Sequence, residues 1–148
     1  MSIVQHLFAY AADFEKTFVD DDWSRLERRF AEDATYEVQN TSFACTVRGR
    51  DAILAALRKS IEGFDRRFDD RQLAVTRGPV VEDDTVEIDW TATYVKADAP
   101  DYLLVGGSVA RFDGDRIVYL CDRYPDGVSE SAAAWIREHA PDFDPSYV

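Results

Sequence analysis

The spacing of apolar residues just after Asp22 constrains the fold of this chain more than any other feature of the sequence. Trp23, Leu26 and Phe30 are three and then four residues apart, so a helix would place them on one face. Asp22 precedes them and is a favourable N-cap residue. We therefore expect an amphipathic helix that starts after Asp22 and carries Trp23, Leu26 and Phe30.

The residues that follow Phe30 no longer have the helical spacing of apolar side chains. Glu32–Ala34 predicts a turn, and Thr35–Val38 alternates in the way that is typical of a short strand. After a loop, Gly49 precedes a further helix whose apolar side consists of Ile53, Leu57, Ile61 and Phe64. The segment therefore predicts two helices joined through a strand.

The rest of the chain extends this pattern on both sides. A first helix is expected over about residues 3 to 19, and four strands are expected at residues 71–81, 85–96, 102–112 and 116–124. Ser129 is the expected cap of a short helix near the C-terminal end, and the residues after Pro141 are expected to be loosely held. Helices followed by an antiparallel meander predict a single α+β domain over residues 1–148.

Composition limits the possible functions. The chain of 148 residues is 46% hydrophobic, which is enough for one core. Its net charge of −12 argues against nucleic acid and anionic membranes as partners. We find no signal peptide or membrane span, and the two cysteines, Cys45 and Cys121, suggest no disulfide framework and a cytoplasmic location.

The sequence also lacks the common signatures of cofactor sites. His6 and His139 lie near opposite ends of the chain, and no closely spaced Cys/His cluster is present, so no metal site is expected. Gly106 and Gly107 fall within an expected strand, whereas a phosphate-binding loop lies between a strand and a helix. We therefore expect no cofactor.

Three motifs carry a resemblance to a known family: DW…L…F.EDA.YE, RGRDAI and RIVYLCDRYPDG. Their order and spacing resemble the nuclear-transport-factor-2-like superfamily, and its SnoaL-like branch in particular. The resemblance covers about residues 3 to 126 and implies a cone-shaped fold in which a curved sheet wraps around helices. It also implies a mostly apolar cavity, which members use for different purposes.

Alternation in the last expected strand identifies a candidate catalytic residue. Val118, Leu120, Asp122 and Tyr124 share one face of that strand. If this face lines the cone, burial would raise the pKa of Asp122 and suit it to proton transfer near neutral pH. The resemblance implies the same role, since several SnoaL-like cyclases and relatives similar to limonene epoxide hydrolase carry an acid/base Asp there. The alternative is that Asp122 pairs with a neighbouring arginine or with solvent.

The same argument predicts the other residues of the cavity wall. The expected ligand-binding residues are Tyr10, Phe14, Tyr36, Trp90, Tyr94, Ser108, Leu120 and Tyr124. For each aromatic residue, simple core packing is the alternative. Gly106 and Gly107 predict a β-bulge in preference to a notch for substrate.

The chain departs from other chemistries of the superfamily. The positions that match the catalytic groups of ketosteroid isomerase are Phe14, Val38 and Ser108, which cannot perform that reaction. Asp89 matches a middle-strand Asp of limonene epoxide hydrolase, but no Arg stands two residues before it, and Asp89 and Trp90 must face opposite sides of the sheet. Chemistry similar to that of scytalone dehydratase needs two pocket histidines, which this chain is poorly placed to supply.

Two functional hypotheses remain. The first is a cofactor-free lyase, isomerase or polyketide-cyclase-like enzyme that binds a small apolar molecule and uses Asp122 to move a proton. The second is a non-catalytic ligand-binding module or a homodimer. In a homodimer, the outer sheet face would form the interface through Glu87, Asp89, Thr91 and Thr93.

Overall fold

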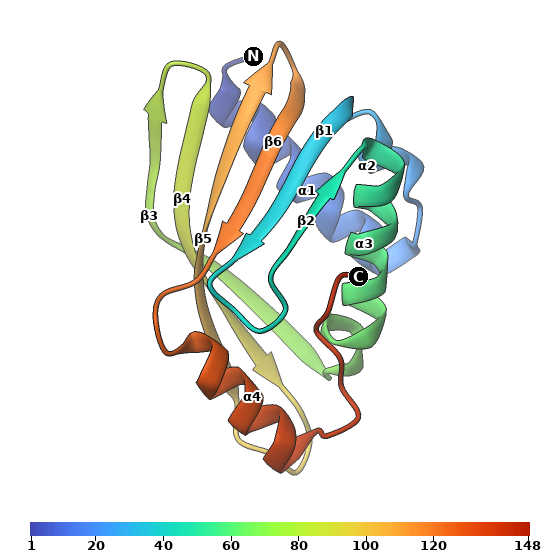
Figure 1. The fold of residues 1–148 in the computed structure, drawn as a ribbon, viewed down its shortest axis with the longest axis vertical. Helices are drawn as coiled ribbons and strands as arrows, with labels where there is room; N and C mark the ends of the chain where they lie inside the picture. Colours follow the sequence, from blue (N-terminus) through green and yellow to red (C-terminus); the bar gives the residue numbers. More distant parts are fainter.

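One curved six-stranded sheet organises the structure, a computed structural model that describes all of residues 1–148 (Figure 1). The strand order is β2-β1-β6-β5-β4-β3. The strands are β1 (Phe30–Gln39), β2 (Cys45–Arg48), β3 (Asp70–Glu82), β4 (Thr85–Val95), β5 (Tyr102–Asp113) and β6 (Arg116–Arg123). The last four form the expected antiparallel meander, and β1 joins it by pairing parallel to β6.

The helices cover the concave face and one end of this sheet (Figure 1). They are α1 (Ile3–Asp20), α2 (Ser24–Glu27), α3 (Arg50–Gly63) and α4 (Val128–His139), with a 3₁₀ turn, η1 (Asp65–Arg67), after α3. The predicted α+β cone is confirmed. None of the helices has both the length and the apolar character that a membrane crossing requires.

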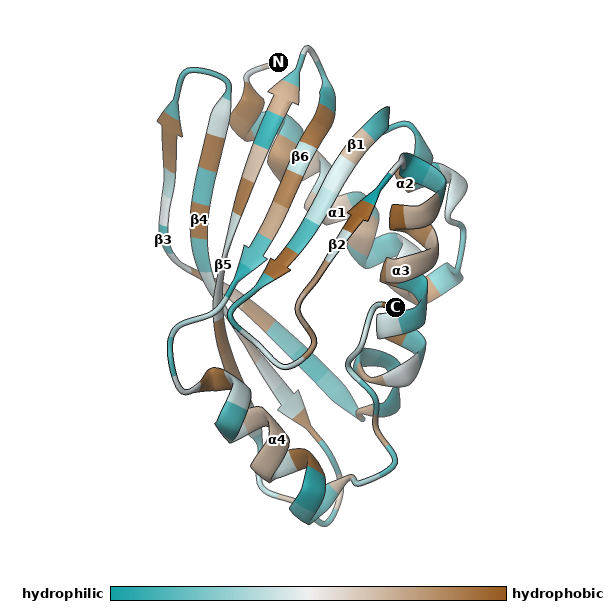
Figure 2. Ribbon diagram, viewed as in Figure 1, coloured by the Kyte–Doolittle hydropathy of each residue, from teal (hydrophilic) through white to brown (hydrophobic).

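The sheet has an apolar inner face because its strands alternate with period two, as the banding of β4, β5 and β6 in Figure 2 shows. In β4, Val86, Ala92 and Tyr94 are buried, whereas Glu87 and Asp89 on the opposite face pair with Arg77. The predicted phase of β4 is therefore correct, and the phases of β5 and β6 follow from their continuous register with it near Ser108 and Asp122.

The helix expected after Asp22 is only one turn long. It ends at Glu27, and Phe30 begins β1, where it is fully buried and pairs with Ile117. The segment Glu32–Ala34, expected as a turn, lies inside this longer strand. Phe30 pairs with Ile117 and is buried in the core, so tertiary contacts override the local helical spacing.

Two further elements differ from expectation. The short strand β2 was not expected, and Cys45 begins it instead of lying in a loop. The cap of α4 is Gly127, in the left-handed conformation, and Ser129 lies within the helix.

The segment after Pro141 is held in place, contrary to expectation. Phe143 is buried, with its ring 5.1 Å from that of Phe68. The backbone N–H of Asp144 donates to the carbonyl oxygen of Gly63 at 2.9 Å, and Ser60 Oγ donates to the carbonyl oxygen of Pro145 at 3.1 Å. Aromatic packing and these hydrogen bonds fix the tail along α3.

Candidate functional site

The concave face of the sheet and the helices enclose a cavity of about 340 Å³. Of its 31 lining residues, 24 are hydrophobic, so the cavity suits a small, largely apolar molecule. All the residues predicted for the site line it: Tyr10, Phe14, Tyr36, Trp90, Tyr94, Ser108, Leu120, Asp122 and Tyr124. They come from α1, β1, β4, β5, β6 and the residue that follows β6.

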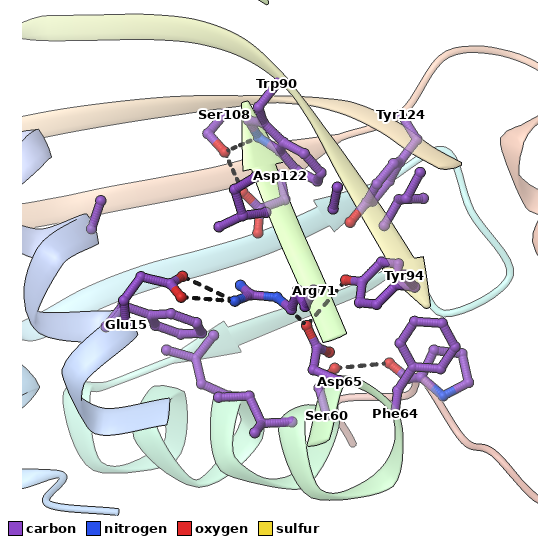
Figure 3. Close-up of a pocket in the computed structure, with 18 of the residues that line it drawn as sticks. Glu15, Ser60, Phe64, Asp65, Arg71, Trp90, Tyr94, Ser108, Asp122 and Tyr124 are labelled. Atoms are coloured by element: carbon purple, nitrogen blue, oxygen red, sulfur yellow. Dashed lines mark hydrogen bonds and ion pairs between the residues drawn. The ribbon is translucent and has the colours of Figure 1, made fainter. Parts of the chain in front are cut away.

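Asp122 lies at the centre of a hydrogen-bonded chain in the cavity wall (Figure 3). Trp90 Nε1 donates to Ser108 Oγ at 2.8 Å, and Ser108 Oγ donates to Asp122 Oδ1 at 2.6 Å. Tyr36 Oη donates to Asp122 Oδ2, also at 2.6 Å. The register of the strands explains this convergence. Ser108 of β5 pairs with Asp122 on one side of β6. On the other side, Asp122 pairs with Val38 of β1, which lies two residues after Tyr36.

The chain fixes where Asp122 can hold a proton. An indole N–H can only donate, so the Ser108 hydroxyl accepts from Trp90 and directs its own hydrogen to Oδ1. Oδ1 is therefore held as an acceptor, and a proton bound by Asp122 goes to Oδ2. Burial raises the pKa of Asp122, with the hydrogen bonds from Ser108 and Tyr36 opposing this rise. The raised pKa suits this carboxyl group to accept and release a proton.

A second polar group in the cavity was not predicted. Arg71, at the start of β3, lies between Glu15 of α1 and Asp65 of η1 (Figure 3). Arg71 Nη1 contacts the two carboxylate oxygens of Glu15 at 3.0 and 2.9 Å, and Nε lies 3.1 Å from Asp65 Oδ2. Tyr94 Oη donates to Asp65 Oδ2 at 3.1 Å. Burial raises the pKa of Asp65, while Arg71 and Tyr94 act in the opposite direction.

Other candidates lie outside the cavity. Asp89 faces away from the cavity, because it lies on the opposite side of the strand from its neighbour Trp90. Its carboxylate pairs with Arg77 at 2.6 Å. His6 packs against Phe112, with 6.1 Å between ring centroids. His139 packs against Trp135, with 5.3 Å between ring centroids and 22% of its side chain exposed. Neither histidine can therefore act in the pocket.

The remaining sulfur and metal-ligand candidates add no further site. Cys45 and Cys121 are both free thiols, and burial raises the pKa of each. No group of three or more His, Cys, Asp or Glu side chains is placed to hold a metal ion.

Gly106 makes room for Trp90, and the β-bulge predicted there is wrong. The pairing of β4 with β5 continues without interruption through Gly106 and Gly107. A Cβ atom at Gly106 would lie 2.8 and 2.9 Å from two ring carbons of Trp90 and 3.0 Å from Tyr124. The glycine therefore lets the indole lie across the strand and reach Ser108.

Substitution of Gly106 by Ala is expected to destabilise the protein by about 1–3 kcal/mol, because two packed aromatic rings must shift. Gly107→Ala is the matched control. Its Cβ would approach mainly the Asp89 carboxylate on the exposed outer face, at 2.8 Å, and that side chain can turn away. Urea unfolding of both variants tests this, and equal losses would contradict the assigned role of Gly106.

Comparisons with known proteins agree with the fold. A protein-family model described as the SnoaL-like domain matches residues 11–120. No curated protein matches the sequence. An NTF2-like protein of unknown function from Burkholderia pseudomallei is similar, at 18% identity and a TM-score of 0.63, over 93% of this chain and 97% of that one.

Two other similar structures contain small molecules. TerC co-crystallised with polyporic acid is 14% identical, with a TM-score of 0.67 over 90% of this chain and 97% of that chain. A hypothetical protein with a ketosteroid isomerase-like fold from Catenulispora acidiphila, in complex with trimethylamine, is 18% identical, with a TM-score of 0.59 over 81% of this chain and 88% of that chain. At these identities the structures show a shared fold, and the family match, over more than half of the sequence, shows that the chain belongs to the SnoaL-like domain family.

Proposed function

We propose that this protein binds a small, largely apolar molecule in its cavity and that Asp122 moves a proton on it, as a cofactor-free lyase, isomerase or cyclase would require. The observation that carries the proposal is the buried Asp122 carboxyl group, held by Ser108 and Tyr36 in an aromatic cavity of about 340 Å³. The small molecules in the TerC and Catenulispora structures support binding of a small ligand.

Proton exchange at carbon tests the acid/base role without knowledge of the natural reaction. A bicyclic ketone such as 1-tetralone carries weakly acidic C–H bonds next to its carbonyl group, and these exchange with D₂O when a base removes and returns the proton. The wild-type protein is expected to accelerate this exchange over buffer, as followed by NMR, and Asp122→Asn is expected to remove the acceleration. Equal exchange rates with the two proteins would rule out the role of Asp122.

A second candidate function is self-association through the outer sheet face. Beside Thr91 and Thr93, the neighbouring strand exposes Leu103 by 56% and Val105 by 38%. These apolar side chains support the predicted homodimer, because a soluble surface gains from covering them. Light scattering over a dilution series is expected to show a dimer that Leu103→Asp converts to monomer. A monomer at all wild-type concentrations would contradict this candidate.

A further inference from the structure

Arg71 lines the cavity with a hydrogen-bond donor that the protein itself leaves unpaired. Arg71 is the one basic side chain among the residues that line the cavity, and its side chain is only 10% exposed. Burial of a guanidinium group is costly unless its N–H donors are all paired. An N–H donor of such a group that has no partner in the protein therefore marks a place where an acceptor from a ligand would fit.

One of the three nitrogens of Arg71, the terminal Nη2, has neither a hydrogen-bond partner nor an ion-pair partner. Nη1 donates to Glu15, but Nη2 makes no hydrogen bond in the structure. Nε is fully buried and faces Asp65, whose Oδ2 lies 3.1 Å away in an ion pair, so a ligand cannot reach it. The guanidinium group also lies over the Phe18 ring, with its central carbon 4.9 Å from the ring centroid, a cation–π contact. The N–H donors of Nη2 thus remain available to a ligand.

The charges around Arg71 select the kind of acceptor. Glu15 and Asp65 together carry two negative charges beside one positive charge when both are ionised. A carboxylate or phosphate on the ligand would add a further negative charge beside these two carboxylates, and like charges repel. A neutral oxygen acceptor meets the unpaired N–H donors without that repulsion.

We propose that Arg71 forms a subsite that binds an uncharged carbonyl-type oxygen of the ligand, and that Glu15 and Asp65 exclude anionic ligands from the same position. The inference rests on the proposed ligand-binding function, because the subsite lies in the same cavity as Asp122. It adds that the ligand has an apolar body with a neutral acceptor oxygen at the Arg71 end. Asp122 belongs to β6, which β5 and β4 separate from the strand that carries Arg71, so the two polar groups recognise different parts of the ligand.

Three naphthalene probes of similar shape test the subsite by isothermal titration calorimetry at pH 8. They are 2-acetylnaphthalene, which has a neutral carbonyl group, 2-isopropenylnaphthalene, which replaces the carbonyl oxygen by carbon, and 2-naphthoate, which is an anion. The wild type is expected to bind the ketone about tenfold or more tightly than the hydrocarbon, the range expected for one hydrogen bond from a charged donor. The anion is expected to bind most weakly.

Variants separate the two parts of the inference. Arg71→Met is expected to remove the advantage of the ketone while the hydrocarbon binds within about twofold of its wild-type affinity, and Asp122→Asn is expected to keep that advantage. Glu15→Gln removes one negative charge beside Arg71, so binding of 2-naphthoate is expected to rise by about tenfold. This gain cannot result from misfolding, so the inference remains testable even if Arg71→Met does not fold.

The outcomes distinguish the subsite from the proposed function. If the wild type binds the hydrocarbon and the ketone equally, or if Glu15→Gln does not improve binding of the anion, the subsite is wrong but ligand binding by the cavity stands. If none of the three probes binds to the wild type, the ligand-binding function itself fails, and the subsite fails with it.

Discussion

Asp122→Asn is expected to abolish catalysed proton exchange and, at the same time, to make the protein more stable at neutral pH. The loss of an acid/base group reduces rates by about 10²–10⁴-fold. The Asn side chain keeps the shape of Asp122, and its amide can still accept from Ser108 and donate to the hydroxyl oxygen of Tyr36. The variant therefore keeps the local contacts and lacks the buried ionisable group.

The gain in stability follows from the direction of the pKa shift. Because burial raises the pKa of Asp122, the folded protein still holds this proton at pH values where the unfolded chain, with a carboxyl pKa near 3.9, has released it. Stability of the wild type therefore falls as the pH rises from about 3.9 through the raised value. The Asn variant lacks this loss, so its advantage is expected to grow over that range.

Thermal unfolding between pH 4 and pH 8 measures this difference. A gain of about 2–4 °C at pH 8 corresponds to roughly 1 kcal/mol in a domain of this size. Asp89→Asn is the matched control, because Asp89 lies on the outer face of the same sheet, paired with Arg77. If the difference in unfolding temperature between the wild type and Asp122→Asn did not change with pH, the Asp122 carboxyl group would have the same pKa in the folded and the unfolded protein.

Period-two alternation explains why the aromatic and Asp122 side of the site was predictable. Ser108 pairs with Ile88 of β4 and with Asp122 of β6, and Trp90 lies on the same face of β4 as Ile88, so the correct phase of one strand places the others. Local turn residues fixed that phase at the hairpins. The prediction needed no knowledge of long-range contacts beyond the order of the strands.

The Arg71 group was missed because its three residues come from a helix, a polar connection and a strand end that the sequence does not bring together. Asp65 begins the polar run DRRFDD, Arg71 follows that run, and Glu15 belongs to α1. A signal was present, since Arg71 is in phase with Leu73 and Val75, which line the cavity. The sequence does not show that η1 folds back toward β3, and only this contact brings Asp65 to Arg71.

The length of the helix after Asp22 was unpredictable for a related reason. Three apolar residues at helical spacing fit one face of a helix, but Phe30 is required by β1, where it lies in the core beside Ile117. Non-local pairing decided this boundary. The tail after Pro141 was also misjudged, because the anchor for Phe143 is a cluster of aromatic rings from distant parts of the chain.

Gly63→Ala is expected to release this tail and open the cavity. A Cβ atom at Gly63 would clash with the backbone oxygen of Asp144, so the helix and the tail could not keep their present contact. Tyr147, which lines the cavity and packs against Tyr36 with 5.5 Å between ring centroids, would move with the tail. Its removal would uncover the wall beside Asp122.

Hydrogen exchange of residues 141–148 measures the release. An overpacking cost of about 1–3 kcal/mol corresponds to roughly 5- to 150-fold faster exchange of amides that open with the tail, such as that of Asp144. Lys59→Met is the matched control, because it removes the contacts of Lys59 with Ser146 and Val148 but leaves the approach at Gly63 intact. If the tail controls access to the cavity, Gly63→Ala should also bind and release the naphthalene probes faster, whereas Lys59→Met should resemble the wild type. Unchanged exchange in Gly63→Ala would mean that the anchor of Phe143 alone holds the tail.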